Sequence, residues 1–416
     1  MNNKVESPHP GLGFGAFVFM MACFMALNGL AVDTMLPALP AIGQELGLEN
    51  PNSRQWVITS YLLGFGIFQL FYGPLSDRFG RRPVLLTGVS IYAFFSLITV
   101  FVGSFEAVVL SRFLQGAGAA VSRVLVIAIV RDCYSGRTMA KVMSLSFIIF
   151  LLVPILAPAI GQAVMVFVSW HWIFLGLAIF AMILTLWAWL YLPETLCREN
   201  RLPLSFSRVL TAFTLVVTTR QSIGYSVAMM LMMGTIFGYI NSAQQLFADS
   251  FDAERLFTLY FALTALSMAL ASFLNARIVE HLGTRRVSHT AVCAMLLVSV
   301  IHWLIAYAGY ETLVVFVIFQ SLGMFCFGLA GPNFGAMAME PVGHIAGTAS
   351  SVQGCMTTVG AAVLGYLVGQ AFDGTALPFI SSYVLLTFAT IVILFFTEGR
   401  LFQPLHESVK DQPFNQ

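Results

Sequence analysis

Long apolar stretches alternate with short polar breaks along the whole chain. Six of them precede residue 193, at 13–41, 54–74, 83–103, 105–130, 142–166 and 172–192. Six more follow, at 223–247, 256–279, 287–308, 311–338, 346–371 and 376–397. A helix needs about 20 apolar residues to cross the hydrocarbon core of a bilayer, so each stretch has the length of a transmembrane helix. The pattern predicts an all-α membrane protein with twelve transmembrane helices.

Composition excludes a soluble globular protein. Hydrophobic residues make up 58% of the 416 residues and charged residues only 9%, whereas a soluble domain carries roughly 25% charged residues. In lipid only helices and closed barrels satisfy their own backbone hydrogen bonds. The ten-residue alternation of barrel strands does not occur in this sequence, which leaves the helical bundle.

The longest polar interval divides the apolar stretches six and six. We therefore predict an N-terminal six-helix bundle at 1–192, a cytoplasmic linker at 193–221, a C-terminal six-helix bundle at 222–398 and a cytoplasmic tail at 399–416. The two bundles are expected to be pseudo-symmetric.

Positive charge predicts the orientation, because Lys and Arg in short loops are retained in the cytoplasm. With the N-terminus inside, only Arg54 and Arg255 fall in outer loops. The inner loops and tails hold all the other Lys and Arg residues except Arg112 and Arg123: Lys4, Arg78, Arg81, Arg82, Arg131, Arg137, Lys141, Arg198, Arg201, Arg208, Arg220, Arg277, Arg285, Arg286, Arg400 and Lys410. Both termini are thus expected in the cytoplasm.

A charged loop after the second stretch recurs in the second half. The first copy contains Gly73, Asp77, Arg78, Gly80, Arg81 and Arg82, and the second contains Ala276, Glu280, Gly283, Arg285 and Arg286. Glycine permits a tight turn, and the arginines can bind helix C-terminal carbonyls or an opposing acid. The alternative is a basic loop that only sets topology. The ordered acid, glycine and arginine favour a duplicated six-helix unit, which is a common transporter plan.

This loop resembles the signature loop of the major facilitator superfamily. Further motifs resemble its twelve-helix drug:proton antiporters, and the closest resemblance is to the bicyclomycin and chloramphenicol resistance branch. They are Asp33-Thr-Met-Leu-Pro37-Ala-Leu-Pro40, Arg112-Phe-Leu-Gln115-Gly116-Ala-Gly118, Arg131-Asp132, Ala157-Pro158-Ala-Ile-Gly161-Gln162, Trp170-His171-Trp172, Pro193-Glu194-Thr195 and Gly347-Thr-Ala-Ser-Ser351. The resemblance implies a conformational gating role for both charged loops, which would brace the cytoplasmic side in the outward-open state. It also implies an antiporter helix marked by Pro154, Pro158 and Gly161.

Two departures from the family pattern concern drug export. Ala157 and Gln162 replace the outer glycines of the antiporter motif. Met25 and Ala26 stand where a multidrug member of the family carries an additional acid in the first helix, which argues against recognition of cationic drugs.

Asp33 is the one acidic residue that falls well inside an apolar stretch. A charge at membrane depth costs about 2.5–3.5 kcal/mol on insertion scales, so the carboxylate needs a partner, a wet cavity or a proton. Burial favours the neutral form, which makes Asp33 a candidate proton carrier. The alternative is a packing residue paired permanently with Arg112. The resemblance implies that Arg112 responds to the protonation state of Asp33, so these two are the predicted proton-coupling residues.

Arg112 and Arg123 are expected on one face of the fourth helix. Eleven residues are close to three helical turns, which places them about 16 Å apart along the axis. For Arg123 two readings stay open: contact with an anionic substrate, or snorkelling or a structural ion pair near the cytoplasmic end. Other polar residues could face a substrate cavity or only bond neighbouring helices: Tyr61, Gln69, Tyr239, Asn241, Gln244, Asn333 and Gln353.

We predict proton-coupled efflux of small amphipathic drugs or antibiotics, neutral or weakly anionic, by alternating access. The alternative is export of an endogenous metabolite, such as a siderophore, sugar or amino-acid derivative. A copper transporter, suggested by Met229, Met230, Met232 and Met233, ranks lower because methionine also lines permissive apolar cavities. No enzyme motif, Walker A sequence or metal site is found. We expect no cofactor beyond the coupling proton, no nucleic-acid partner, a monomer in the lipid bilayer, and the bacterial inner membrane as its location.

Overall fold

A computed structural model describes residues 12–204 and 206–399 and confirms the predicted twelve membrane-length helices. The N-terminal half contains α1 (Phe14–Asp33), α2 (Leu39–Glu45), α3 (Trp56–Phe79), α4 (Arg81–Thr99), α5 (Phe105–Cys133), α6 (Gly136–Phe167) and α7 (His171–Tyr191). The C-terminal half contains α9 (Arg220–Gln245), α10 (Phe257–Leu282), α11 (Thr284–Tyr307), α12 (Leu313–Met339), α13 (Ala346–Gln370) and α14 (Leu377–Glu398). Lys4, Arg400, Lys410 and the predicted tail beyond Gly399 lie outside the described residues.

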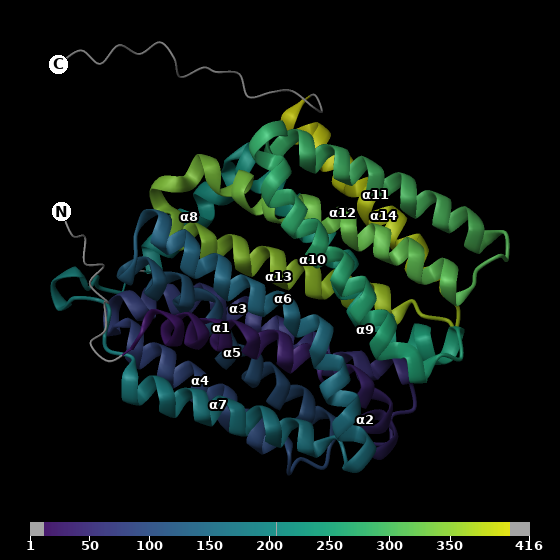
Figure 1. Ribbon diagram of the computed structural model, residues 1–416, viewed down its shortest axis with the longest axis horizontal. Coiled ribbons are helices and arrows are strands. Elements are labelled where there is room, and N and C mark those ends of the chain that lie inside the picture. The colour runs from purple at the N-terminus through teal and green to yellow at the C-terminus, as the bar shows by residue number, and fades with distance from the viewer. Residues whose placement is uncertain (1–11, 205, 400–416) are drawn as a thin grey trace.

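The two halves repeat one packing pattern and lie side by side (Figure 1). In the first half α3 packs on α5, α4 on α5 and α7, and α1 on α6. In the second half α10 packs on α12, α11 on α12 and α14, and α9 on α13. The halves meet mainly along two seams, α3 with α13 and α6 with α10. Each seam pairs helices that do not follow one another in sequence.

Small residues let the helices of the first half approach closely. A Cβ atom on Gly64 would lie 2.0 Å from the carbonyl oxygen of Phe113, and one on Gly116 would lie 2.0 Å from the carbonyl oxygen of Tyr61. Without side chains at these two positions, the backbones of α3 and α5 come into contact. This contact carries Arg112, one turn before Gly116, against the start of α3.

The first membrane span is interrupted, whereas the sequence predicted one continuous stretch over 13–41. Helix α1 ends at Asp33, a single 3₁₀ turn covers Leu36–Ala38, and α2 begins at Leu39. Pro37 and Pro40 lack the amide hydrogen that would continue the helical ladder, which accounts for the interruption. Asp33 therefore lies at a helix end inside the bundle.

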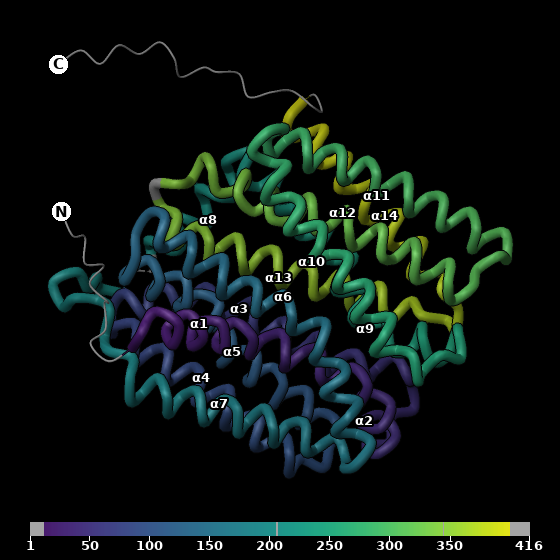
Figure 2. Tube along the Cα trace, viewed as in Figure 1, coloured from purple at the N-terminus to yellow at the C-terminus, as the bar shows by residue number. Residues whose placement is uncertain are grey.

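The segment between the halves contains a short helix that the hydropathy pattern did not predict. Helix α8 (Phe206–Thr218) buries Ala212 and Val216 against Val342, Ala349 and Val352 of the C-terminal half. Figure 2 follows the chain from α7 through this segment to α8 and on to α9. We call this end of the bundle, where α1 begins and α14 ends, the linker end. The other end, with the loops at residues 46–55, 246–256 and 371–376, is the opposite end.

Candidate functional site

Arg112 is completely buried where α1, α3 and α5 meet. Its Nε donates to the carbonyl oxygen of Val57 at 2.9 Å, and its Nη1 donates to Oε1 of Gln115 at 2.6 Å. Its Nη2 donates to the carbonyl oxygen of Ala31 at 3.0 Å. One side chain thus ties three helices together, and each of its nitrogens has an acceptor.

Two aromatic rings complete the surroundings of this guanidinium. Its central carbon lies 4.4 Å from the ring centre of Tyr61 and 5.7 Å from that of Phe174. The faces of aromatic rings attract cations, and the attraction is strongest where water is excluded. The hydroxyl of Tyr61 donates to Oδ1 of Asn28 at 3.0 Å, which holds the ring in place. The charge of Arg112 is thus stabilised by carbonyl dipoles and ring faces.

The bond to Ala31 explains why the guanidinium reaches α1. The last four carbonyls of a helix have no donor within it, and α1 stops two residues after Ala31. A cation at a helix C-terminus also interacts favourably with the helix dipole. Arg112 therefore caps the interrupted end of α1.

Asp33 lies at the same helix end and is only 4% exposed. Among the residues that the structure describes, no carboxylate oxygen lies within 4.0 Å of the Arg112 guanidinium. The permanent ion pair that one reading of Asp33 required does not exist in this conformation. Asp33 is also the one aspartate or glutamate among the buried residues of the described chain.

Helix α6 connects this helix end to the other half. A Cβ atom on Gly161 would lie 2.1 Å from the carbonyl oxygen of Thr34, so only glycine permits the approach. The next residue, Gln162, accepts a hydrogen bond of 2.7 Å through Oε1 from the hydroxyl of Thr258 on α10. Pro154 and Pro158 lie inside the same helix. The interrupted span and the α6–α10 seam are therefore in direct contact.

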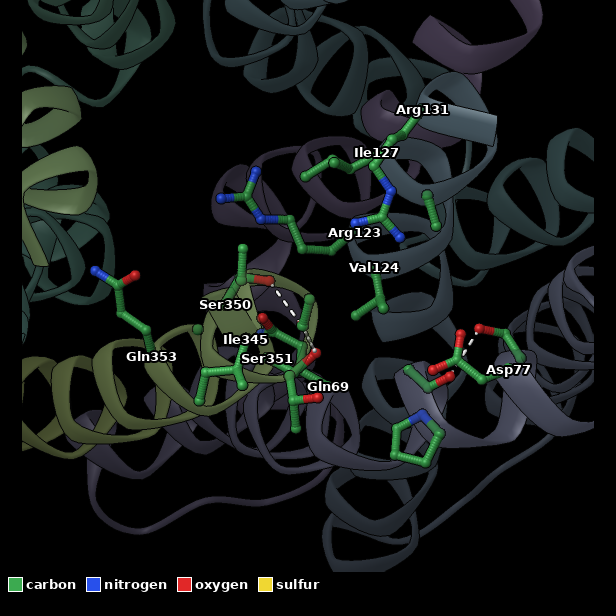
Figure 3. Close-up of a pocket in the computed structure, with 18 of the residues that line it drawn as sticks. Gln69, Asp77, Arg123, Val124, Ile127, Arg131, Ile345, Ser350, Ser351 and Gln353 are labelled. Atoms are coloured by element: carbon green, nitrogen blue, oxygen red, sulfur yellow. Dashed lines mark hydrogen bonds between the residues drawn. The ribbon is translucent and has the colours of Figure 1, made fainter. Parts of the chain in front are cut away.

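A cavity of about 660 Å³ lies between the two halves at the linker end (Figure 3). Helices α3 and α5 form its wall in the first half, and α9, α12, α13 and the 3₁₀ turn Glu340–Ile345 form its wall in the second. Its polar lining includes Gln69, Ser76, Asp77, Arg81, Arg123, Arg131, Thr348, Ser350, Ser351, Gln353 and Thr357. The volume falls within the usual range of small-molecule pockets, about 300–1,000 Å³.

The charges in this cavity are unbalanced. Arg81 is held by Oδ1 of Asp77 at 2.6 Å and by Oδ2 of Asp132 at 3.0 Å. Arg123 and Arg131 are exposed to the cavity, and neither forms an ion pair with a described residue. The cavity therefore carries excess positive charge on its α5 wall.

Of the residues predicted for the substrate cavity, Gln69, Arg123 and Gln353 line it in this conformation. The others lie elsewhere. The hydroxyl groups of Tyr239 and Thr264 are 3.2 Å apart, and Asn333 exchanges side-chain hydrogen bonds with Asn275. Tyr61 bonds Asn28, Asn241 bonds Phe237, and Gln244 lies in α9 outside the cavity lining. Asp33 and Arg112 are likewise absent from the lining, so the candidate proton site and the cavity are separate here.

On α13 the sequence predicts Gln353 as a residue that could face the cavity, and Gln353 lines it. The hydroxyl-bearing residues of the same helix that line the cavity were not predicted: Thr348, Ser350, Ser351 and Thr357. The signal that could identify most of them is the polar, small-residue run Gly347-Thr-Ala-Ser-Ser351 at the start of an apolar stretch. Such residues suit a helix end that faces a ligand or a neighbouring helix.

The two charged loops make different contacts. In the first copy, Arg82 donates to the carbonyl oxygen of Trp189 in α7, and the backbone N–H of Arg81 donates to Oε1 of Glu194 at 2.8 Å. In the second copy, Nε of Arg285 lies 3.4 Å from Oε1 of Glu398. Gly80 and Gly283 adopt φ of 107° and 80°, values that favour glycine. Arg78 and Glu280 form no ion pair within the described part of the chain. In the described part of the chain, the ion pairs of each loop stay within its own half.

At the opposite end the two halves are joined by side-chain amides. Gln55 donates through Nε2 to Oε1 of Gln245 at 2.8 Å and to the carbonyl oxygen of Gly369 at 2.9 Å. Nε2 of Gln370 donates to Oε1 of Gln55 at 3.1 Å and to the carbonyl oxygen of Asn52 at 2.8 Å. We call this cluster of Asn52, Gln55, Gln245 and Gln370 the amide latch. It closes the bundle at the end away from the cavity.

An ion pair lies beside the amide latch. Nη2 of Arg54 is 3.6 Å from Oδ2 of Asp249, which belongs to the other half. The Asp249 side chain is half exposed, and exposed ion pairs contribute only about 0–1 kcal/mol. The buried amide hydrogen bonds therefore contribute most of the free energy that holds this end of the bundle closed.

Replacing Gln55 by alanine is expected to open this end. The substitution removes three hydrogen bonds between the halves, each worth about 0.5–1.5 kcal/mol. We expect amide hydrogen exchange at residues 50–56 and 369–376 to become about tenfold faster, which corresponds to about 1.4 kcal/mol. Exchange at residues 343–351 should slow as the cavity closes. Gln44→Ala, at an exposed glutamine of the same end, is the control. Unchanged exchange at 369–376 would contradict the role of the amide latch.

Comparisons with known proteins agree with this architecture. The chain is 28% identical over 395 residues to a protein of Haemophilus influenzae named "Bicyclomycin resistance protein homolog", covering 92% of this chain and 96% of the relative. It is 29% identical over 385 residues to a "Chloramphenicol resistance protein" of Pseudomonas aeruginosa, covering 91% and 89%. Its fold matches the xylose transporter XylE of E. coli with a TM-score of 0.72 at 12% identity, covering 91% and 97%.

The family model with the description Major Facilitator Superfamily matches residues 14–365. This range contains ten of the twelve spans completely, most of the eleventh and both charged loops. The members of this family are transporters, so the chain is a membrane transporter and not an enzyme. The repeated six-helix halves and the match over most of the sequence lead to one conclusion: the chain belongs to the Major Facilitator Superfamily.

Proposed function

We propose that this transporter exports small amphipathic compounds, neutral or weakly anionic, in exchange for protons, by alternating access. The observation that carries the proposal is the cavity between the halves, open at the linker end while the amide latch closes the opposite end. Such an arrangement is one of the two states that alternating access requires. The names of the curated relatives, which concern bicyclomycin and chloramphenicol resistance, support export of drugs.

The orientation that we propose follows from the basic residues. Most described Lys and Arg residues outside the spans belong to the linker end, and positive charge favours the cytoplasmic side. The linker end then faces the cytoplasm of a bacterial cell, across the inner membrane. The structure would represent the inward-open state, in which a compound enters the cavity from the cytoplasm or the inner leaflet.

Asp33 and Arg112 are the proposed coupling residues. While Asp33 is protonated, Arg112 can remain on the carbonyl oxygen of Ala31, as observed. Loss of the proton creates a carboxylate two residues further along the chain, and this carboxylate competes with Ala31 for the guanidinium. The interrupted end of α1 would then move relative to α5. The proton thus changes the relative stability of two arrangements of one helix end.

The contact of Gly161 with Thr34 passes this movement to α6. Since Gln162 of α6 is bonded to Thr258 of α10, a shift of the α1 end alters the seam between the halves. Proton binding and cavity access would then be coupled through the conformation rather than through a shared binding site.

Electrostatics supports the proposed substrate preference. The cavity lining contains three arginines and one aspartate, and the aspartate is already paired. A cation in this cavity would be repelled, whereas a neutral or anionic compound would not. We therefore expect phenicol-like drugs to be transported better than quaternary ammonium compounds.

Transport in inside-out membrane vesicles tests the proposal. An imposed pH gradient, acidic inside, is expected to drive uptake of labelled chloramphenicol, and drug addition should release protons from the lumen. A protonophore should abolish both signals, and vesicles without the transporter serve as the control. Uptake that persists after the gradient is dissipated would refute proton coupling. If chloramphenicol fails, the same proton-release assay screens amino-acid, sugar and siderophore derivatives.

A further inference from the structure

We propose that the cavity contains a binding site for an anionic group, a carboxylate, sulfonate or phosphate, with Arg123 as its main contact. The inference rests on the proposed function, in that it takes the cavity as the substrate site. It goes further by naming the substrate class: an amphiphile with one anionic group and an apolar body. It also assigns Arg123 as a residue that determines specificity.

The position of Arg123 decides between the readings that the sequence left open. Its side chain extends from α5 into the space between the halves, toward the start of α13 (Figure 3). A snorkelling arginine would instead run along the lipid-facing surface to the membrane interface. A structural ion pair would need a carboxylate, and no described carboxylate lies within 4.0 Å of this guanidinium.

Arg131 adds a second positive charge nearer the mouth of the cavity. It lies eight residues after Arg123 on the same helix, which is about 12 Å along the axis. Like Arg123 it lines the cavity and has no ion pair with a described residue. Since low-dielectric walls strengthen the field of unpaired charges, these two arginines attract an anion from the linker end and hold it inside. Asp77, the one acid in the cavity lining, and Asp132, the sequence neighbour of Arg131, are both engaged by Arg81, so the three arginines still exceed the two acids.

The α13 side of the cavity complements the arginines. Helix α13 starts at Ala346, whose N–H donates to the carbonyl oxygen of Gly343, and no side chain caps the amino end of the helix. The first N–H groups of a helix have no acceptor within it and stabilise negative charge. Ser350 and Ser351 now donate to the carbonyl oxygen of Gly347 at 2.9 Å and 3.4 Å, and their hydroxyl groups can rotate toward a ligand. An anion at Arg123 would thus meet donors from both halves.

The remaining lining explains why the ligand should be amphipathic. Val124, Ile127, Met229 and Ile345 line the same cavity and offer apolar contact next to the charged wall. A small inorganic anion would leave this surface unfilled. A molecule with a flat apolar body and one acidic group would use both surfaces and would bridge the halves.

Binding of a matched probe pair to the detergent-purified, full-length transporter tests the site. The probes are dansyl-phenylalanine, which carries a carboxylate, and its methylamide, which is neutral and otherwise the same. Fluorescence anisotropy should show at least about tenfold tighter binding of the carboxylate by the wild type, equivalent to about 1.4 kcal/mol. Arg123→Gln should remove this preference by weakening carboxylate binding, while methylamide binding stays unchanged. Arg131→Gln should weaken carboxylate binding less than Arg123→Gln does. Arg123→Lys should retain part of the preference for the carboxylate.

Arg137→Gln is the matched control, because Arg137 is exposed at the linker end without lining the cavity. Equal affinity of the wild type for both probes would overturn the proposal, and so would a preference that survives Arg123→Gln. A thermal melt shows whether each variant is folded, and Arg123→Lys keeps the test decisive if the glutamine variant is not. Repeating the titration with added phosphatidylglycerol identifies a lipid headgroup as the anion if the lipid competes with the carboxylate probe. Competition would assign the site to lipid and overturn its assignment to substrate.

The proton-release assay separates this inference from the proposed function. Proton-coupled chloramphenicol export with no carboxylate preference would refute the anion site and leave the exporter intact. A carboxylate preference without proton release would support the anion site and refute the proton-coupled exporter.

Discussion

Replacement of Asp33 by asparagine is expected to abolish drug-dependent proton release from inside-out vesicles. Asparagine has nearly the same shape as aspartic acid, and it resembles the protonated form because it carries no charge. It cannot take up or release a proton, so the exchange cycle loses its coupling ion. Drug binding by the variant should stay within about threefold of that of the wild type at low pH, under 1 kcal/mol, because Asp33 does not line the cavity.

The pH dependence of drug binding gives an independent check. If drug binding releases a proton, protonation must weaken drug binding by the same factor, because the linkage is reciprocal. Affinity of the wild type should therefore fall as the pH falls, whereas Asp33→Asn should show a flat profile. Asp373→Asn is the control, since Asp373 is an exposed acid in a loop of the opposite end. Full proton release by Asp33→Asn would remove Asp33 from the mechanism.

The helices could be predicted from the sequence because apolar length is a strong signal. The stretch predicted at 376–397 is α14 at Leu377–Glu398, and the stretch at 346–371 is α13 at Ala346–Gln370. The interruption after Asp33 could not be read from hydropathy, since a broken span and a continuous one are equally apolar. Helix α8 was not predicted because its 13 residues are too few to span a bilayer, and the search was for stretches of membrane-spanning length.

The site was only partly predictable, and the difference follows from the energetics of single residues. Asp33 and Arg112 stand out because a charge in an apolar stretch is costly. Ser350 and Thr357 do not stand out, because a hydroxyl in a helix can donate to its own backbone, as Thr357 does to Gln353 at 2.8 Å. The amide latch could not be predicted from the sequence, since Gln55 and Gly369 come into contact only after the two halves pack together.

Replacement of Arg112 by methionine is expected to cost both stability and transport. Methionine is apolar and long enough to fill part of the space, yet it leaves Oε1 of Gln115 and the carbonyl oxygen of Ala31 without their donor. A buried acceptor that loses its partner costs about 1–3 kcal/mol, so a loss of about 2–6 kcal/mol is expected for the pair. The change should appear as a lower midpoint in a thermal melt of the purified protein. Arg137→Met, at an exposed arginine, should leave the midpoint unchanged.

Arg112→Lys separates the charge from the geometry. Lysine keeps the positive charge but cannot place donors on three helices at once, because its ammonium group lacks the planar fork of arginine. We expect it to recover part of the stability and little of the transport. Recovery of full proton-coupled transport by lysine would show that only the charge matters.

The double variant Asp33→Asn with Arg112→Met tests whether the two residues act as one unit. If Arg112 serves to stabilise the deprotonated state of Asp33, Arg112→Met leaves a carboxylate buried without a cation, and removing that carboxylate should restore some stability at alkaline pH. The double variant should then melt above Arg112→Met at high pH, and this advantage should vanish at low pH, where Asp33 is protonated in both. Strict additivity at every pH would mean that Arg112 only holds α1, α3 and α5 together, as its three hydrogen bonds already show that it does.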